Sequence, residues 1–526
     1  MTRPAPLAND ADPAEQVADG SSGGAAPTTA WWTVVVPVVV AAALWVPGIG
    51  AGSIINGDDA LYAVTVRGLV EGDGGWLRAL GWRPPLYFAF ASASAASLGL
   101  GELGLRLPGL VFAVAAVGAT AALGARLFSS LGHAAAQRVG VLAGLALALS
   151  AQLAIFARTV RGIDALFMLL AIAAVFVAVR ARSTTQWALA GGLAGLAFLA
   201  KSVVVATLVA PMAWLVVTAP GPLRDRARCA AAAVAATASV GATWTIALAV
   251  WSPGGLRDHV DNHVVRRATG GALVGESHGP GYYLEQLFTF EGFVWMLALA
   301  GAAGLLAARR LPLRERALPA LWAAWTIGLF SAATTKLPHY LLPSYPALTI
   351  AGAGALVVTA ARLRPALQLA AGAALVVASV LTAPAQVWTT LGSADFAPGD
   401  RDAAMQAREF TGADGTLLVW SHYHVGASFY FGGRSRMLSD NPGMLGVYRR
   451  THGFAEGTHF DEVSLDEVGA ALHAAAPACL WVPAPRDTPA VVQRVEASLA
   501  SVAPGARRIH VLSGAMWCVS ATVPPR

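Results

Sequence analysis

Two adjacent carboxylates, Asp58 and Asp59, lie in the stretch NGDDALYA, just beyond an apolar run long enough to cross a membrane. Arg83 follows in the stretch RPPLYF. A carboxylate can accept a proton from an attacking hydroxyl, or hold a divalent metal together with a second carboxylate. An arginine binds phosphate through two parallel hydrogen bonds. At a bilayer these groups indicate a lipid-phosphate substrate, although a solvated turn or a helix cap would also explain the two acids.

Other charged residues lie at the ends of apolar runs. Asp164 stands three residues after Arg161, and Lys201 interrupts the run FLAKSVVV. Ionisable side chains at membrane depth are costly, which favours a functional role. The alternatives are a structural ion pair for Asp164 and a lysine that reaches the interface. KLPHY places Lys336 and His339 around a proline, an arrangement that a topology anchor would also explain.

The composition indicates a membrane protein. The chain has 526 residues, of which 56% are hydrophobic and 13% are charged. Soluble domains contain about 25% charged residues, whereas repeated spans of roughly 20 apolar residues account for this imbalance. The formal net charge is only +6, and no basic stripe is interleaved with aromatic residues. Nucleic acid is therefore not an expected partner.

Arginine-bearing joints between the apolar runs predict the orientation in the membrane. Short, positively charged loops stay in the cytoplasm. All of these joints lie inside if the N-terminus is cytoplasmic and the run 84–100 lies along the outer interface instead of crossing. About 11 spans of the required length then remain. The charged candidate residues all fall on the outer side. The joints are 126–138, 180–182, 224–228, 309–316 and 362–364.

The chain is predicted to have three parts. Residues 1–30 contain almost no large apolar side chains and are predicted to be a disordered cytoplasmic N-terminus. Residues 31–384 are the predicted transmembrane catalytic domain, with external loops at 50–104 and 252–290. Residues 385–526 mix strand-like runs such as ACLWVP with helix-like runs such as DEVGAALHAA. That alternation predicts a soluble extracytoplasmic α/β domain.

The three cysteines give limited information. Cys229 opens an apolar run, and no CxxC or His/Cys spacing indicates zinc. Cys479 and Cys518 both lie in strand-like runs of the C-terminal part. A disulfide between them is permitted outside the cytoplasm, and a pair of buried free thiols is the alternative.

Six short motifs in order carry a resemblance to a known superfamily. They resemble those of the GT-C membrane glycosyltransferases, in particular the aminoarabinose transferases that modify lipid A and the protein O-mannosyltransferase-like enzymes of family 39. The late motif is close to the family form over its whole length. The resemblance implies a polytopic α-helical fold with a C-terminal α/β domain. The motifs are DDALYA, RPPLYF, LRLPGL, ARTVRGID, FLAK and KLPHYLLPSYPAL.

The resemblance also implies catalytic roles. Asp58 matches the carboxylate that acts as base on the acceptor hydroxyl, and Asp59 matches its acidic neighbour, which is Glu in the family. Asp164 matches an Asp at the start of a later span. Arg83 stands where the family has a Lys that contacts the lipid phosphate. Trp82 replaces an acid of the aminoarabinose enzymes, which argues against an aminoarabinose donor.

The resemblance implies a group of residues that bind the lipid phosphate and the sugar. These are Tyr62, Arg83, Arg158, Lys201, Arg267, Tyr283, Lys336 and His339.

The implied reaction is an inverting transfer of a sugar from a polyprenyl-phosphate donor to an acceptor hydroxyl. It would take place on the outer face of a bacterial cytoplasmic membrane, and the acceptor would be a lipid, a glycan or a protein. A metal is not required, because fixed cations can take its place. The adjacent carboxylates of Asp58 and Asp59 could still bind a divalent metal.

Three other classes of protein are alternatives to a glycosyltransferase. A flippase for lipid-linked sugars would explain the spans and the charges but predicts inverted repeats. A lipid-phosphate phosphatase would need a His or Ser nucleophile, and SHYHVGAS at 421–428 is the only His-rich stretch. A purely structural membrane protein would have no reason to collect charges on one side.

Overall fold

A computed structural model gives the structure of the chain. It describes residues 30–54, 57–72, 80, 83–265, 269, 278–361, 364–382, 398–421, 424–432, 434–442 and 458–520. The predicted disordered segment, apart from Ala30, lies outside the described residues, as do Trp82 and Arg267.

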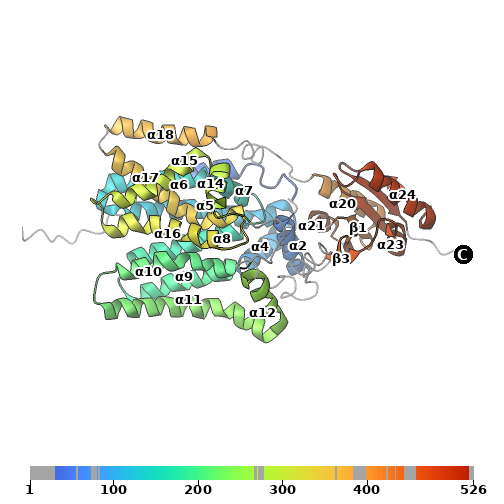
Figure 1. Cartoon of the computed structure of the whole chain (residues 1–526), viewed down its shortest axis with the longest axis horizontal. Helices are drawn as coiled ribbons and strands as arrows, with labels where there is room; N and C mark the ends of the chain where they lie inside the picture. The colour runs from blue at the N-terminus through green and yellow to red at the C-terminus, as the bar shows by residue number, and fades with distance from the viewer. Residues whose placement is uncertain are drawn as a thin grey trace, which may run out of the picture.

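A bundle of helices forms the larger part of the molecule, and a smaller α/β region follows it at the C-terminal end (Figure 1). The bundle consists of α1 (Trp31–Trp45), α2 (Asp58–Glu71), α4 (Leu86–Leu98), α5 (Glu102–Leu127), η2 (Ser129–Leu131), α6 (His133–Ala148), α7 (Ala151–Ala157), α8 (Ile163–Arg180), α9 (Thr184–Lys201), η3 (Ser202–Leu208), α10 (Val209–Val217), α11 (Leu223–Trp251), α12 (Pro253–Val260), η4 (Asp261–Val265), α14 (Tyr282–Glu291), α15 (Phe293–Ala307), α16 (Leu313–Ala332), η5 (Pro338–Ser344), α17 (Tyr345–Ala360) and α18 (Pro365–Thr382).

Small residues let the helices of the bundle approach closely. Helix α5 packs against α1, α6 and α8, while α9 packs against α8 and α11. A Cβ atom added at Gly191 would overlap the backbone of Ala233, so glycine permits the contact between α9 and α11. Interfaces rich in Gly and Ala are typical of helices packed within a membrane.

Several helices are long and apolar enough to cross a bilayer, so the chain is a multi-pass membrane protein. Among the described residues there are five such segments, and a sixth if α6 and α7, bent by 65° relative to each other, count as one span. Helix α4 has only 13 residues, fewer than the roughly 20 that a span needs. The count of about 11 spans remains a prediction from run length. The five segments are Glu102–Leu127, Ile163–Arg180, Thr184–Val217, Leu223–Trp251 and Pro338–Ala360.

The C-terminal α/β region, residues 398–520, contains a six-stranded sheet in the order β3-β2-β1-β4-β6-β5. Strands β1 to β4 run parallel, and β6 and β5 are added antiparallel at one edge. The sheet and its helices agree with the predicted α/β alternation. The elements are α20 (Pro398–Thr411), β1 (Thr416–Trp420), α21 (Val425–Phe431), β2 (Arg434–Ser439), β3 (Thr458–Glu462), α23 (Val468–Ala474), β4 (Ala478–Val482), α24 (Pro489–Val502), β5 (Arg507–Ile509) and β6 (Ala515–Val519).

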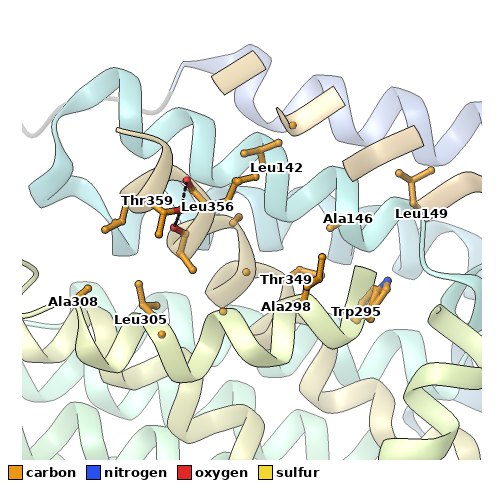
Figure 2. A pocket seen from close by; sticks show the side chains of 18 residues that line it. Leu142, Ala146, Leu149, Trp295, Ala298, Leu305, Ala308, Thr349, Leu356 and Thr359 are labelled. Atoms are coloured by element: carbon orange, nitrogen blue, oxygen red, sulfur yellow. Dashed lines mark hydrogen bonds between the residues drawn. The ribbon is translucent and has the colours of Figure 1, made fainter. Parts of the chain in front are cut away.

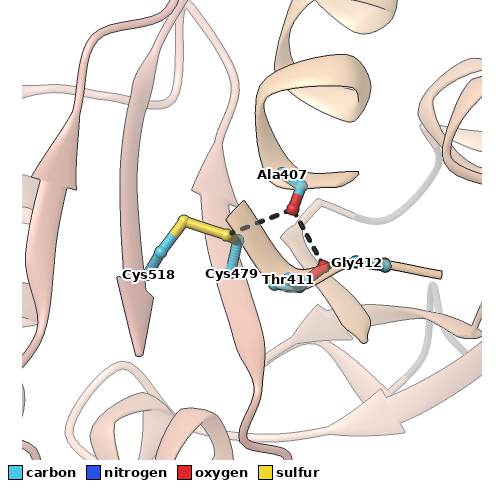
Figure 3. The surroundings of a disulfide bond; sticks show 5 residues. All are labelled: Ala407, Thr411, Gly412, Cys479 and Cys518. Carbon is cyan, nitrogen blue, oxygen red and sulfur yellow. Dashed lines mark hydrogen bonds between the residues drawn. A yellow bond between two sulfur atoms is a disulfide. The ribbon is translucent and has the colours of Figure 1, made fainter. Parts of the chain in front are cut away.

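A disulfide joins Cys479 of β4 to Cys518 of β6, so the bridge that the sequence left open is present in the structure (Figure 3). The two residues are direct partners in the antiparallel register. Both are fully buried beneath α20, and the sulfur of Cys479 lies 3.9 Å from the carbonyl oxygen of Ala407. A disulfide is expected in an oxidising compartment, which agrees with an extracytoplasmic location.

An apolar cavity of about 410 Å³ lies between α6, α15, α17 and α18 (Figure 2). Its polar side chains include Thr349 and Thr359, whose hydroxyls donate to backbone carbonyls of the preceding turn. None of the described residues that line it is charged. The cavity is thus separate in character from the charged residues described next.

Candidate functional site

Helix α2 presents both candidate acids in its first turn. Gly57 precedes the helix with a φ of 99°, a conformation that favours glycine, and Asp58 and Asp59 follow at once. The positive end of the helix dipole stabilises carboxylates at this position. Asp59 is 1% exposed, whereas Asp58 is partly exposed. The two acids therefore have different surroundings although they are neighbours.

Val160, in the motif ARTVRGID, forms hydrogen bonds with residues of two other motifs. Its backbone N–H donates a hydrogen bond to the carboxylate of Asp59, and its carbonyl accepts a 2.6 Å hydrogen bond from the Tyr87 hydroxyl. Tyr87 is fully buried. The segments DDALYA, RPPLYF and ARTVRGID, which are far apart in sequence, are thus held together through one residue.

Two glycines allow these segments to meet. The Cα atoms of Gly109 and Gly162 face each other so closely that a Cβ added at Gly162 would overlap Gly109 and approach the Tyr87 ring to 2.9 Å. Gly109 belongs to the motif LRLPGL, and Gly162 lies just before α8. A fourth motif is therefore packed against the same point by backbone contact.

Arg106 of the same motif holds the chain that leads toward α2. It is 1% exposed and donates hydrogen bonds of 2.9 Å to the Ile49 carbonyl and 2.7 Å to the Ser53 carbonyl. Arg158 is also buried, and its burial, followed by the positive charge of Arg106, lowers its pKa. The guanidinium of Arg106 is therefore close enough to disfavour the charged form of Arg158.

Lys201 and Asp164 form an ion pair in which the Asp164 side chain is buried, at 4% exposure, and the Lys201 side chain is 15% exposed. Lys201 is the last residue of α9, and Asp164 lies in the first turn of α8. Arg161 and Asp58 also interact electrostatically with Asp164. Asp164 therefore interacts both with Lys201 at the end of α9 and with Asp58, the candidate base on α2.

The backbone after Lys201 is unusual. Ser202 has a φ of 49°, and it is the one non-glycine residue with positive φ among the described residues. Its hydroxyl lies 3.2 Å from the Nε2 atom of His259 on α12, a helix within the stretch 252–290 that the sequence predicts as an external loop. Such backbone strain persists where surrounding contacts enforce it, and it concentrates at functional sites.

A chain of ring and cation contacts brings the late motif to the same place. The Arg161 guanidinium lies 4.5 Å from the centre of the Phe156 ring, and the His339 ring lies 5.3 Å from Phe156. The Tyr340 and His339 rings meet edge to face, with 4.9 Å between their centres. The Lys201 ammonium lies 5.7 Å from the centre of the Tyr340 ring. His339 thus lies among residues that surround the ion pair.

Tyr283 and Lys336 lie near this chain of contacts. Tyr283 is 1% exposed and interacts electrostatically with Tyr340. Lys336 is 4% exposed, and its ammonium donates a 2.5 Å hydrogen bond to the carbonyl of Ala333, within its own loop.

Arg83 and Tyr62 lie against each other. The Arg83 guanidinium is 5.5 Å from the centre of the Tyr62 ring, and Tyr62 contacts the Phe88 ring edgewise at 5.4 Å. An arginine over an aromatic face is attracted by the negative ring centre. One N–H group of Arg83 donates a 3.4 Å hydrogen bond to the Leu80 carbonyl, and a guanidinium has five N–H donors in all. This places a phosphate-binding type of side chain against Tyr62 of helix α2.

Three buried residues that the sequence analysis did not single out stabilise the site. Tyr87 and Arg106 hold backbone segments, as described above. Glu291 accepts hydrogen bonds from the Ser150 hydroxyl at 2.8 Å and from two backbone N–H groups at the start of α7. Only Arg106 could have been singled out from the sequence, because it is a charged residue inside the apolar stretch LRLPGL.

The described residues contain no group of three His, Cys, Asp or Glu side chains that could hold a metal ion. Asp59 uses its carboxylate for the Val160 N–H, and Asp164 is paired with Lys201. The described cations of the candidate site include Arg83, Arg158 and Lys201.

Comparisons with known proteins agree with this arrangement. Residues 82–244, less than half of the chain, match the model of a family described as dolichyl-phosphate-mannose-protein mannosyltransferase. No curated protein matches the chain. The structure of ArnT from Cupriavidus metallidurans bound to undecaprenyl phosphate is 19% identical and covers 95% of this chain and 100% of its own, with a TM-score of 0.66.

The chain has the GT-C fold. Two further GT-C structures match at lower similarity. The arabinofuranosyltransferase AftD from Mycobacteria gives a TM-score of 0.54 at 15% identity, over 94% of this chain and 40% of its own. The oligosaccharyltransferase from Archaeoglobus fulgidus gives 0.51 at 13% identity, over 93% of this chain and 73% of its own.

The GT-C fold confirms the resemblance that the order of the motifs predicted. The family model covers the middle motifs, from RPPLYF to FLAK, so sequence similarity and fold similarity agree over that segment.

Proposed function

We propose that this chain is a glycosyltransferase that moves a sugar from a polyprenyl-phosphate donor to an acceptor hydroxyl, with inversion at the anomeric carbon. The observation that supports it best is the contrast between Asp59, buried on the Val160 N–H, and Asp58, partly exposed at a boundary rich in fixed cations. The ArnT structure, which has the same fold, is bound to undecaprenyl phosphate, and that supports a polyprenyl-phosphate donor.

In this proposal Asp58 is the general base. The acceptor oxygen attacks the anomeric carbon while the Asp58 carboxylate takes the hydroxyl proton. The bond between the anomeric carbon and the phosphate oxygen breaks, and its electron pair leaves with the lipid phosphate. Proton transfer to a positioned carboxylate contributes about 10²–10⁴-fold to the rate.

The leaving phosphate gains negative charge, so cations that already stand in place stabilise the transition state. Arg83, on the surface of the Tyr62 ring, and Arg158 are assigned to the phosphate. Lys201 is assigned to the same charge and is kept oriented by Asp164. Tyr62, Tyr283, Lys336, His339 and Arg267 are the remaining residues proposed to border the donor.

The proposal includes the arrangement in the membrane. Residues 31–384 would form the catalytic domain, and residues 385–526 a soluble domain on the extracytoplasmic side of a bacterial cytoplasmic membrane. The disulfide between Cys479 and Cys518 supports that side, because such bridges persist in oxidising compartments.

The test uses the full chain in lipid nanodiscs, a panel of polyprenyl-phosphate sugars and a membrane extract as acceptor. We expect release of polyprenyl phosphate with one donor, together with a new glycosidic bond of inverted configuration. Movement of the intact donor across the bilayer of vesicles, with no release from any donor, would contradict the proposal and favour a flippase.

A further inference from the structure

Helix α21 of the C-terminal α/β region lies between the sheet and helix α2 (Figure 1). Its residues Ala427 and Phe431 are buried in the core formed with the sheet. Val425 and Phe429, on another face, are buried in the core of the helical bundle at 1% and 2% exposure. One short helix thus packs against both parts of the molecule.

A hydrogen-bond network runs across this contact. The Ile54 N–H donates a 2.7 Å hydrogen bond to the Tyr430 hydroxyl oxygen. That hydroxyl in turn donates a 2.9 Å hydrogen bond to the Glu102 carboxylate. Arg401 of α20 approaches the same carboxylate oxygen of Glu102 at 3.4 Å. Burial raises the pKa of Tyr430 well above its usual value, so the hydroxyl remains a donor at neutral pH.

A cation–aromatic contact adds to the network. The Arg67 guanidinium of α2 lies 4.7 Å from the centre of the Phe429 ring. Arg67 also approaches Glu71 at 3.8 Å along its own helix. The C-terminal end of α2 is therefore held by α21 as well.

The network includes Ile54, which lies shortly before the candidate base Asp58 in the sequence. Ile54 lies four residues before Asp58 in the sequence. Arg106 binds the two carbonyls of Ile49 and Ser53 in the same connection, and Glu102 lies one helical turn before Arg106 on α5. The described part of this connection, up to Ile54, is thus held directly by Arg106 and, through Tyr430, by Glu102.

We propose that Tyr430 is a positioning residue that holds the start of α2, so that the C-terminal α/β region takes part in the reaction by placing Asp58. This inference rests on the proposed function. The Tyr430 hydroxyl accepts a hydrogen bond from the Ile54 N–H and donates one to the Glu102 carboxylate. A phenylalanine at this position would remove both hydrogen bonds. Small displacements of a reacting group, of about 1 Å, can lower a rate on the order of 100-fold.

The first experiment does not depend on activity. Amide hydrogen exchange is measured for the full chain in nanodiscs without donor, in wild type, Tyr430→Phe and Arg494→Gln. Arg494 forms an exposed ion pair with Asp466 in the same C-terminal region and serves as the control. We expect exchange of the Ile54 N–H to rise at least about tenfold in Tyr430→Phe, equivalent to one lost hydrogen bond, and to stay unchanged in the control.

The second experiment measures donor turnover per folded molecule. We expect Tyr430→Phe to lower kcat at least about tenfold with an unchanged KM for the donor, since the base is displaced and the donor site is not. Glu102→Ala should reproduce the loss, while Glu102→Gln, which keeps an acceptor for Tyr430, should restore most of the activity.

The outcomes separate this inference from the proposed function. An unchanged Ile54 exchange in Tyr430→Phe would overturn the positioning role whether or not the protein is active. Faster exchange with wild-type kcat would overturn it too. If wild type releases no polyprenyl phosphate, the proposed function fails, and hydrogen exchange still decides whether Tyr430 holds the start of α2.

Discussion

The carboxylate of Asp59 accepts a hydrogen bond from the backbone N–H of Val160, which lies 101 residues further along the chain. Asp58, in the same first turn of α2, remains partly exposed. Among the described residues, no hydrogen bond or ion pair of the Asp58 carboxylate occurs. One acid therefore holds the backbone of two segments together, while its neighbour, the proposed base, is partly exposed.

Replacing Asp59 should affect stability more than chemistry. We expect Asp59→Ala to lower the free energy of unfolding by about 1–3 kcal/mol, because the Val160 N–H is left buried without its acceptor. Asp59→Asn keeps an oxygen that can accept the hydrogen bond and should lose less. Melting temperatures of the purified proteins in one detergent provide the measurement. Equal melting temperatures for wild type and Asp59→Ala would contradict the structural role.

The ion pair between Lys201 and Asp164 should behave as a unit. Removing one partner leaves a buried charge without compensation and is expected to cost about 3–5 kcal/mol. We expect Lys201→Met to be strongly destabilised and the double variant with Asp164→Leu to recover much of the melting temperature. Donor turnover should remain lost in both, because the cation assigned to the leaving phosphate is absent. Additive effects on stability would show that the two side chains do not depend on each other.

Gly162 should tolerate no side chain. A Cβ there would overlap the backbone of Gly109 and press on the Tyr87 ring, so we expect Gly162→Ala to lower the melting temperature clearly. Gly192, inside α9, has no atom within 4 Å of an added Cβ and provides the matched control. Gly192→Ala should be neutral or stabilising by up to about 1 kcal/mol, since alanine favours a helix. A Gly162→Ala protein as stable as the control would refute the close approach.

The disulfide should stabilise the C-terminal α/β region. Its cysteines are 39 residues apart, and closing such a loop contributes about 2–4 kcal/mol. We expect the double variant Cys479→Ser, Cys518→Ser to be more sensitive to protease within residues 398–520. Mass spectrometry of the untreated protein should find the bridge in wild type. Two free thiols in protein exported from the cytoplasm would contradict both the bridge and the proposed location.

Charges inside apolar runs were the strongest signal in the sequence. Asp58, Asp164 and Lys201 stand out because ionisable groups near a membrane are costly unless they have a function or a partner. Their order, read with the short motifs around Arg83 and Lys336, was enough to predict the GT-C fold, which the structural matches confirm.

The pairing of these charges could not be read from the sequence. Lys201 and Asp164 are 37 residues apart, and only the packing of α8 on α9 brings them together. The same holds for Tyr430 and Glu102, which are 328 residues apart. Local patterns predict elements, whereas contacts between distant elements depend on tertiary packing that a single sequence does not display.

Two elements were missed for local reasons. Helix α2 lies within the stretch predicted as an external loop, because its polar residues hide the buried stripe that includes Ala60 and Val64. Strand β2 has the sequence RSRMLS, and its two arginines mask a strand whose last three residues are buried.

Release of polyprenyl phosphate by Asp58→Asn tests the central claim most directly. The variant is compared with wild type and with Asp225→Asn, an exposed acid that pairs with Arg228 on α11. We expect Asp58→Asn to fold as wild type does and to lose turnover by about 10²–10⁴-fold, while Asp225→Asn stays fully active. Turnover of Asp58→Asn at the wild-type rate would contradict the assignment of Asp58 as the base.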